Sequence, residues 1–206
     1  MTTTSVMTYD SLTADIINYT ERNDPQFVAT IPTIIALAEA SIAAELKTFL
    51  QLIVVETTLA PNQTVLAKPT RWRKTVSMKV NGEPLLLRSQ DYVAMYQSES
   101  SSGQPTYYAD YDYMNWTFAP APNATVPVEI IYYSLIQPLD SNNEQNLFTQ
   151  TTPQLMLYAS MYHAMVYLKA QDKIATWKGY FDEAITAIKK EDNSRRIDRN
   201  VSVQEP

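Results

Sequence analysis

Two carboxylates lie within a dense run of aromatic residues in the stretch "PTYYADYDYMNWTFAPAP", residues 105–122. Asp110 and Asp112 are two residues apart, so on a β-strand their side chains would point to the same side. Such a pair can supply the acid and base of a glycosidase, and the rings can stack on sugars or bases. Glycosidase carboxylates usually come from different elements that flank a cleft, however. We therefore expect Asp110 and Asp112 to be solvated residues of a strand or turn.

The aromatic residues of this stretch alternate in a way that predicts two strands. Tyr107, Tyr111 and Tyr113 fall on odd positions, whereas Trp116 and Phe118 fall on even ones. This change of phase indicates a turn near 112–115. Aromatic residues of strands usually pack in the core or against cross-strand neighbours. We therefore expect these rings to lie in the core or in a subunit interface.

The remaining candidates for catalysis, metal binding or cofactor binding are few. His163 is the single histidine, and Ser160, one helical turn earlier, does not form a nucleophile elbow with it. The chain has no cysteine, which excludes disulfides and thiolate metal sites. Gly82, Gly103 and Gly179 are too scattered for a phosphate-binding loop. The sequence thus predicts no enzyme activity, no metal and no cofactor.

Charge and hydropathy restrict the partners. The net charge of −6 argues against a general nucleic-acid-binding surface, but it suits a passage through which DNA slides without being held. No apolar run approaches the roughly 20 residues of a membrane span, so we expect no membrane partner. The first ten residues lack the basic and apolar regions of a signal peptide.

The order of periodic segments predicts an α+β fold. Apolar residues recur at helical spacing within 8–50 and 150–191, which we assign to the N- and C-terminal helices of one bundle. The segment 51–140 is β-prone, with an Asn-Gly turn typical of a hairpin and a strand near 126–135 that is apolar on both faces. We expect an antiparallel sheet or barrel inserted into the bundle, followed by a flexible tail over 192–206.

The helix that begins at Pro153 carries two apolar stripes. The first contains Leu155, Tyr158, Ala159, Tyr162 and Val166, and the second contains Leu157, Met161, Ala164 and Leu168. A helix with two such stripes must be covered on two sides. The second stripe predicts either a central position in the bundle or a face that packs against another subunit.

The C-terminal tail contains a small basic cluster. Arg195, Arg196 and Arg199 accompany Ile197 and Val201, which are four residues apart and would share one face of a helix. A segment of this kind can become a short amphipathic helix when it docks on a partner. We therefore treat these five residues as candidates for docking.

The order of these features resembles that of the adaptor, or head–tail connector, proteins of short-tailed bacteriophages. The resemblance covers about residues 10–190. It is carried by "FVATIPTIIALAEASIAAEL", "LAKPTRWRKTVSM", "GQPTYYADYDYMNWTFAPAP" with "VEIIYYSLIQPL", and "NLFTQTTPQLMLYASMYHAMVYLK" with "WKGYFDEAITAI". The chain departs from that pattern after Gly103, where the glycines usual in the turn of the β-meander are missing.

The resemblance implies a non-enzymatic virion protein of the neck, between the capsid portal and the tail. Twelve copies would form a ring whose C-terminal segments dock on the portal protein. The β regions would face the tail or nozzle proteins, and DNA would pass through the bore in transit. A different class of function also fits the sequence, namely a carbohydrate-binding module of a tail or host-surface protein, in which Trp116 would be the main stacking residue.

Overall fold

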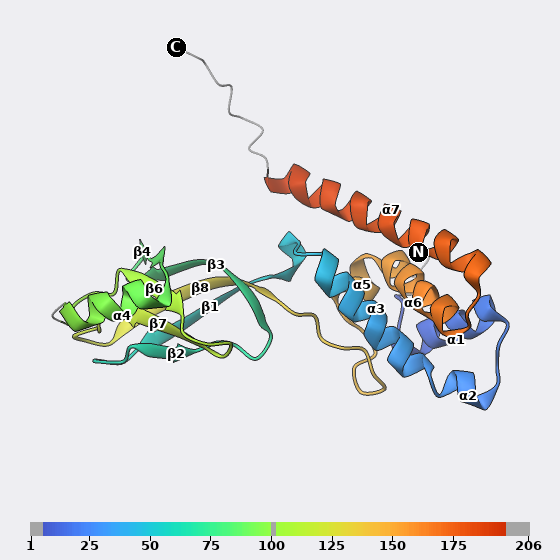
Figure 1. Ribbon diagram of the computed structural model, residues 1–206, viewed down its shortest axis with the longest axis horizontal. Coiled ribbons are helices and arrows are strands. Elements are labelled where there is room, and N and C mark those ends of the chain that lie inside the picture. The colour runs from blue at the N-terminus through green and yellow to red at the C-terminus, as the bar shows by residue number, and fades with distance from the viewer. Residues whose placement is uncertain (1–5, 100–101, 197–206) are drawn as a thin grey trace, which may run out of the picture. The chain divides into compact units, whose positions relative to one another are not determined.

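The computed structural model describes residues 6–99 and 102–196, and the chain divides into two compact units (Figure 1). The helical unit comprises Met1–Leu50 and Ile136–Pro206, and the β unit comprises Gln51–Leu135. Helices from both ends of the chain therefore form one unit, and a β region is inserted between them. This confirms the predicted α+β class. The inserted region is a pair of sheets and not a closed barrel.

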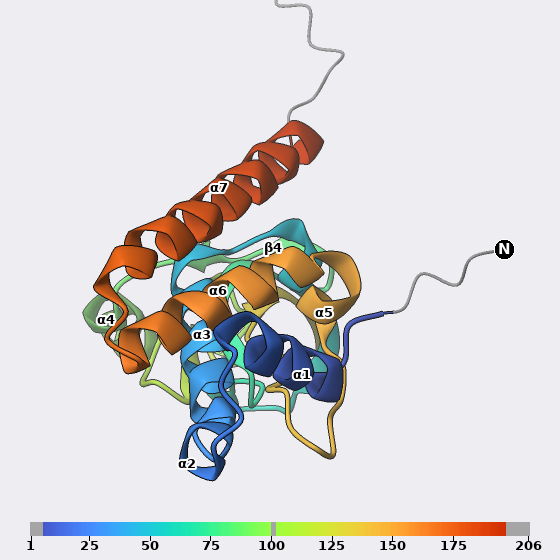
Figure 2. The same ribbon diagram turned by 90° about the vertical axis from the view of Figure 1, so that its right-hand side faces the viewer.

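The helical unit is built around helix α6. Figure 2 shows α6 between α7 and the N-terminal helices, and α6 contacts α1, α3, α5 and α7. The helices of this unit are α1 (Tyr9–Thr20), α2 (Pro25–Val28), α3 (Ile31–Glu45), α5 (Leu147–Thr151), α6 (Pro153–Tyr167) and α7 (Gln171–Arg196). A short 3₁₀ turn, η1 (Phe49–Gln51), leads into the β unit.

Local chemistry sets the ends of the N-terminal helices. Helix α1 starts at a capping box in which Thr8 and Ser11 exchange side-chain and backbone hydrogen bonds. Helix α3 has Pro32 in its first turn, where the missing N–H is harmless. It ends at Glu45, because Leu46 is extended.

The core of the helical unit joins apolar faces of both ends of the chain. The α3 residues of this core recur at helical spacing, and α6 contributes buried residues from more than one of its sides. The buried side chains of this core include Leu12, Ile16, Phe27, Ile31, Ile34, Ile35, Ile42, Phe148, Leu155, Met156, Met161 and Phe181. The N- and C-terminal segments thus depend on each other for burial.

One segment of this core has the composition of a membrane span. Over Pro25–Glu45 the mean hydropathy reaches 1.8, so the expectation that no run approaches such a span is wrong by length and composition. The segment comprises two helices, α2 and α3, and the inner face of α3, including Ile34 and Ala38, is buried in the core. A helix in the core of a folded protein can have the same length and mean hydropathy as a membrane span.

The β unit contains two four-stranded sheets and one helix. The first sheet has the order β1-β8-β3-β4 and the second has the order β2-β7-β6-β5, with α4 (Gln90–Glu99) beside β6 and β7. The strands are β1 (Leu52–Leu59), β2 (Val65–Ala67), β3 (Trp72–Val80), β4 (Glu83–Pro84), β5 (Leu86–Leu87), β6 (Tyr107–Asp110), β7 (Asn115–Ala119) and β8 (Val126–Ser134). The strands β4 and β5 are only two residues long.

Two predictions about this unit are confirmed. Strand β8 is central, as predicted, and pairs antiparallel with both β1 and β3. Asn81 and Gly82 both have positive φ, +50° and +82°, as a type I′ hairpin turn requires. Between the sheets lies a second core that includes Leu59, Met78, Val80, Trp116, Phe118, Val128 and Ile130.

Met161 tests the central position of α6. Met161→Asp should lower the free energy of unfolding by about 3–5 kcal/mol, because it places an unpaired carboxylate in the core. Val166→Asp on the same helix is the matched control; its side chain is exposed, and we expect a change below about 1 kcal/mol. Urea unfolding followed by circular dichroism measures both. Equal stability of the two variants would contradict the central placement.

Candidate interaction sites

Asp110 neutralises a buried lysine. The side chain of Lys68 is 3% exposed, and its Nζ lies 2.6 Å from Oδ1 of Asp110. The same ammonium donates a hydrogen bond to the backbone carbonyl of Asp112 at 2.8 Å and lies 3.9 Å from the centre of the Trp72 ring. Because a buried cation requires a counter-charge, Asp110 has a structural role in the β unit.

Asp112 organises the turn between β6 and β7. Its carboxylate accepts hydrogen bonds from the backbone N–H of Met114 at 2.6 Å and from Nδ2 of Asn115 at 2.9 Å. Hydrogen bonding from the Asn115 side chain is the main cause that lowers the pKa of Asp112 below its ordinary value. Each carboxylate thus has its own structural partners, in agreement with the expectation of strand and turn residues.

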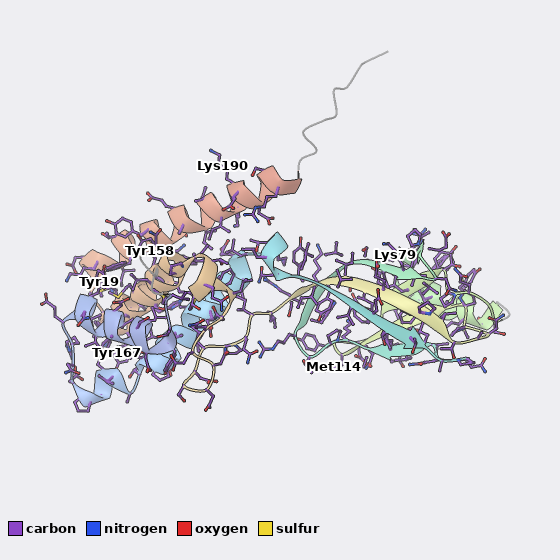
Figure 3. The ribbon with its side chains drawn as sticks, turned by 180° about the vertical axis from the view of Figure 1, so that it is seen from behind. Tyr19, Lys79, Met114, Tyr158, Tyr167 and Lys190 are labelled. Atoms are coloured by element: carbon purple, nitrogen blue, oxygen red, sulfur yellow. The ribbon has the colours of Figure 1, made fainter. Side chains whose placement is uncertain are left out.

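The aromatic stretch forms core, with only its turn exposed. Strands β6 and β7 confirm the predicted pair of strands, and Trp116 is fully buried, with Nε1 donating to Oγ1 of Thr75 at 3.2 Å. Tyr113 and Met114 are exposed at the turn, and Figure 3 labels Met114. A ring that is buried to this degree cannot stack on a sugar from solution.

His163 links two helices of the helical unit. Its Nε2 lies 2.8 Å from Oγ of Ser41 on α3, and burial lowers the pKa of the imidazole below its ordinary value. Ser160, the serine nearest in sequence, is fully buried, and its hydroxyl has no hydrogen-bond partner among the described residues. Sequence reasoning missed Ser41 because it is 122 residues away from His163.

The second stripe of α6 is covered by the chain itself. Met161 and Ala164 are 0% exposed, and Leu157 and Leu168 are partly buried against the same core. Of the two alternatives that the sequence left open, the central position in the bundle accounts for this face. The stripe therefore does not need a neighbouring subunit to cover Met161 and Ala164.

An exposed aromatic group surrounds Trp177 on α7. Tyr19 meets the Trp177 ring edge-on at 5.7 Å, and Tyr158 and Tyr180 lie at 6.1 and 5.8 Å from it. Figure 3 shows Tyr19 and Tyr158 on this side of the helical unit. Helical spacing gives no signal for this grouping, because the four rings come from three helices.

Helix α7 extends further than the sequence predicted. It continues to Arg196, so residues 192–196 are helical and not part of a flexible tail. Arg195 is exposed and lies 2.5 Å from Glu191 one turn earlier. Cations in the last turn of a helix also interact favourably with its dipole. Ile197, Arg199 and Val201 lie outside the described residues.

The C-terminal half of α7 borders a hollow. A cavity of about 370 Å³ lies between this half of the helix and the start of α6, with an apolar lining that includes Leu155, Ala184 and Ile188. An ion pair of 3.0 Å joins Lys189 of α7 to Glu45 of α3. The end of α7 thus presents charged side chains next to a partly open apolar surface.

Comparison with known protein families identifies the chain. A family model described as "SU10 adaptor protein" matches residues 7–204, almost the whole length. The chain belongs to the SU10 adaptor protein family. This confirms the resemblance to bacteriophage adaptors, and such an adaptor is a structural component of the virion. No curated protein gave a significant match.

The Lys68–Asp110 pair predicts a stability effect in the adaptor. Asp110→Asn should lower the free energy of unfolding by about 1–3 kcal/mol, because the buried ammonium loses its counter-charge. Tyr111→Ser, at an exposed neighbouring position, is the control and should change it by less than about 0.5 kcal/mol. Urea unfolding followed by tryptophan fluorescence measures both, since Trp72 and Trp116 lie beside Lys68. An Asp110→Asn protein with unchanged stability would show that the pair has no structural role.

His163 predicts a pH dependence of the adaptor's stability. The imidazole titrates near 6.5 when unfolded and at a lower pH when folded, so between these values the unfolded chain binds more protons. The free energy of unfolding should therefore fall as pH is lowered from 7.5 to 5.5. Urea midpoints at these pH values measure the effect, and His163→Gln should flatten it. An unchanged slope in that variant would assign the dependence to other groups.

Proposed function

We propose that this adaptor forms a ring, of twelve copies by analogy with its family, that joins the capsid portal to the tail. The observation that carries the proposal is the family match over residues 7–204, which covers both the helical unit and the β unit. In this role the protein resides in the neck of the virion. Its partners are the portal protein, the tail or nozzle proteins and its own copies.

The end of α7 is the portion that we assign to the portal. Arg195 and Arg196 occupy the last turn of a 26-residue helix, and Arg195 is exposed. Arg195 borders a small hollow whose lining includes the apolar residues Leu50 and Ile188. Charged side chains around an apolar centre are the usual composition of a protein interface.

The charge of the chain supports a role in DNA passage without DNA binding. Sixteen basic and 22 acidic residues leave the adaptor with a net charge of −6. An acidic lining repels the phosphate backbone, so DNA in transit would not be held. We assign the adaptor no catalytic activity, because Asp110, Asp112 and His163 have the structural partners described above.

The carbohydrate-binding alternative gains no support from the geometry. It depends on Trp116 as a stacking residue, and this ring is fully buried between the sheets.

Binding to the cognate portal tests the proposed function. Wild-type adaptor mixed with portal should give a complex of defined mass, and absence of binding at every salt concentration would overturn the proposal. Arg195→Glu should weaken binding by at least about tenfold, because a loss at each copy is multiplied in a multivalent ring. Lys173→Glu, an exposed site at the other end of α7, is the control and should bind normally. Equal binding of the two variants would remove the α7 end from the interface.

A further inference from the structure

The first sheet of the β unit has an open edge on each side. Among the described residues β1 has β8 as its only strand neighbour, and β4 covers β3 only at Lys79 and Val80. The carbonyl of Met78 accepts a hydrogen bond from the backbone N–H of Leu85. The outer backbone groups of 52–59 and 72–77 therefore face no strand among the described residues. Such an edge is a template on which another strand can add.

Strand β1 lacks the features that normally protect an edge. Within its eight residues there is no proline, no lysine and no bulge, and Glu56 is the single charge. Two of its apolar side chains, Ile53 and Val54, are exposed. An unprotected apolar edge of this length is a hazard for aggregation unless a partner strand covers it.

Strand β3 is a protected edge that admits a selected partner. Its pairing with β8 contains two bulges, next to Arg73 and next to Val76, and Lys74 is exposed. Bulges and lysines discourage indiscriminate pairing, including the pairing of β3 with another copy of itself. A strand that carries a carboxylate would be attracted to Lys74, whereas a second copy of β3 would be repelled by it.

The charges of the two edges are complementary. Glu56 is exposed, without a hydrogen-bond or ion-pair partner among the described residues, and it lies directly opposite Glu129, whose own partner is Lys79 at 2.8 Å. Like charges in that position repel each other. Lys74 likewise has no partner among the described residues. A cation brought to the β1 edge would therefore relieve the local repulsion.

The directions of the strands suit a ring. Strands β1 and β3 both run antiparallel to β8, so they run in the same direction at opposite sides of one sheet. Copies related by rotation about a ring axis can present β1 of one copy to β3 of the next, which is a heterologous contact that closes into a ring. Pairing of β1 with β1 would instead bring two acidic strands together and give a closed dimer.

We propose that β1 of one adaptor copy adds in parallel to the β3 edge of the next copy, with Glu56 of the first facing Lys74 of the second. This inference rests on the proposed ring and names the subunit contact within it. The contact joins the sheets of neighbouring copies into a continuous band, and it covers Ile53 and Val54.

A charge exchange tests the contact in the full-length adaptor bound to its portal. Glu56→Lys and Lys74→Glu should each cause the loss of most ring complexes, as measured by native mass spectrometry, and the double variant should restore them. Folding is protected in Glu56→Lys, since the new cation faces Glu129 of its own chain. Asp91→Lys, an exposed site on α4, is the control and should assemble normally. Normal assembly of Glu56→Lys, or no recovery in the double variant, would overturn the proposal.

Cross-linking distinguishes the proposed contact from other occupants of β1. Because the chain has no cysteine, introduced thiols are the only ones present. A bismaleimide should give a ladder of multimers with Glu56→Cys/Lys74→Cys and no cross-link with either single variant. Dimers from Glu56→Cys alone would show that β1 pairs with β1, and a link from it to portal or tail protein would show that a partner strand occupies the edge. Either result overturns the proposal.

The same experiments separate the strand contact from the proposed function. If wild-type adaptor forms a ring on the portal but the double cysteine variant gives no ladder, the strand contact is wrong and the proposed function stands. If the wild type forms no ring on the portal, the proposed function and the strand contact are both wrong.

Discussion

The burial of α6 is the constraint on which the rest of the helical unit depends. Its inward side chains, such as Met161 and Ala164, are removed from water because α1, α3 and α7 pack around them. Helices α1 and α3 come before the β region in the sequence, and α7 comes after it. The two ends of the chain must therefore meet around one helix. The β unit has a separate core between its two sheets.

Periodicity predicted the elements that carry strong apolar patterns. The strands around Trp116, the central strand β8 and the Asn81-Gly82 turn follow from local sequence because each depends on residues next to each other in the chain. The hairpin turn predicts a returning strand after Gly82, but the division of this segment into β4 and β5, which belong to different sheets, has no signal in two-residue strands. The sequence also does not reveal that the helix extends to Arg196, because the polar composition of 192–196 is equally typical of a tail.

The candidate sites were harder to predict because their chemistry depends on contacts between distant residues. Asp110 was identified from sequence as a carboxylate among aromatic rings, yet its role is determined by Lys68, which is 42 positions earlier and buried beneath it. Ser41 and His163 are a similar case. Composition excluded thiolate and phosphate-loop chemistry, whereas only the folded chain showed that Asp110, Asp112 and His163 have structural partners.

Attachment to the portal is the central claim of this account, and a cryo-electron microscopy map of the adaptor bound to its cognate portal tests it most directly. The account predicts a closed ring of adaptor copies in which the end of α7, with Arg195 and Ile188, contacts the portal. A map in which the β unit contacts the portal, or in which adaptor copies bind singly without touching each other, would contradict it.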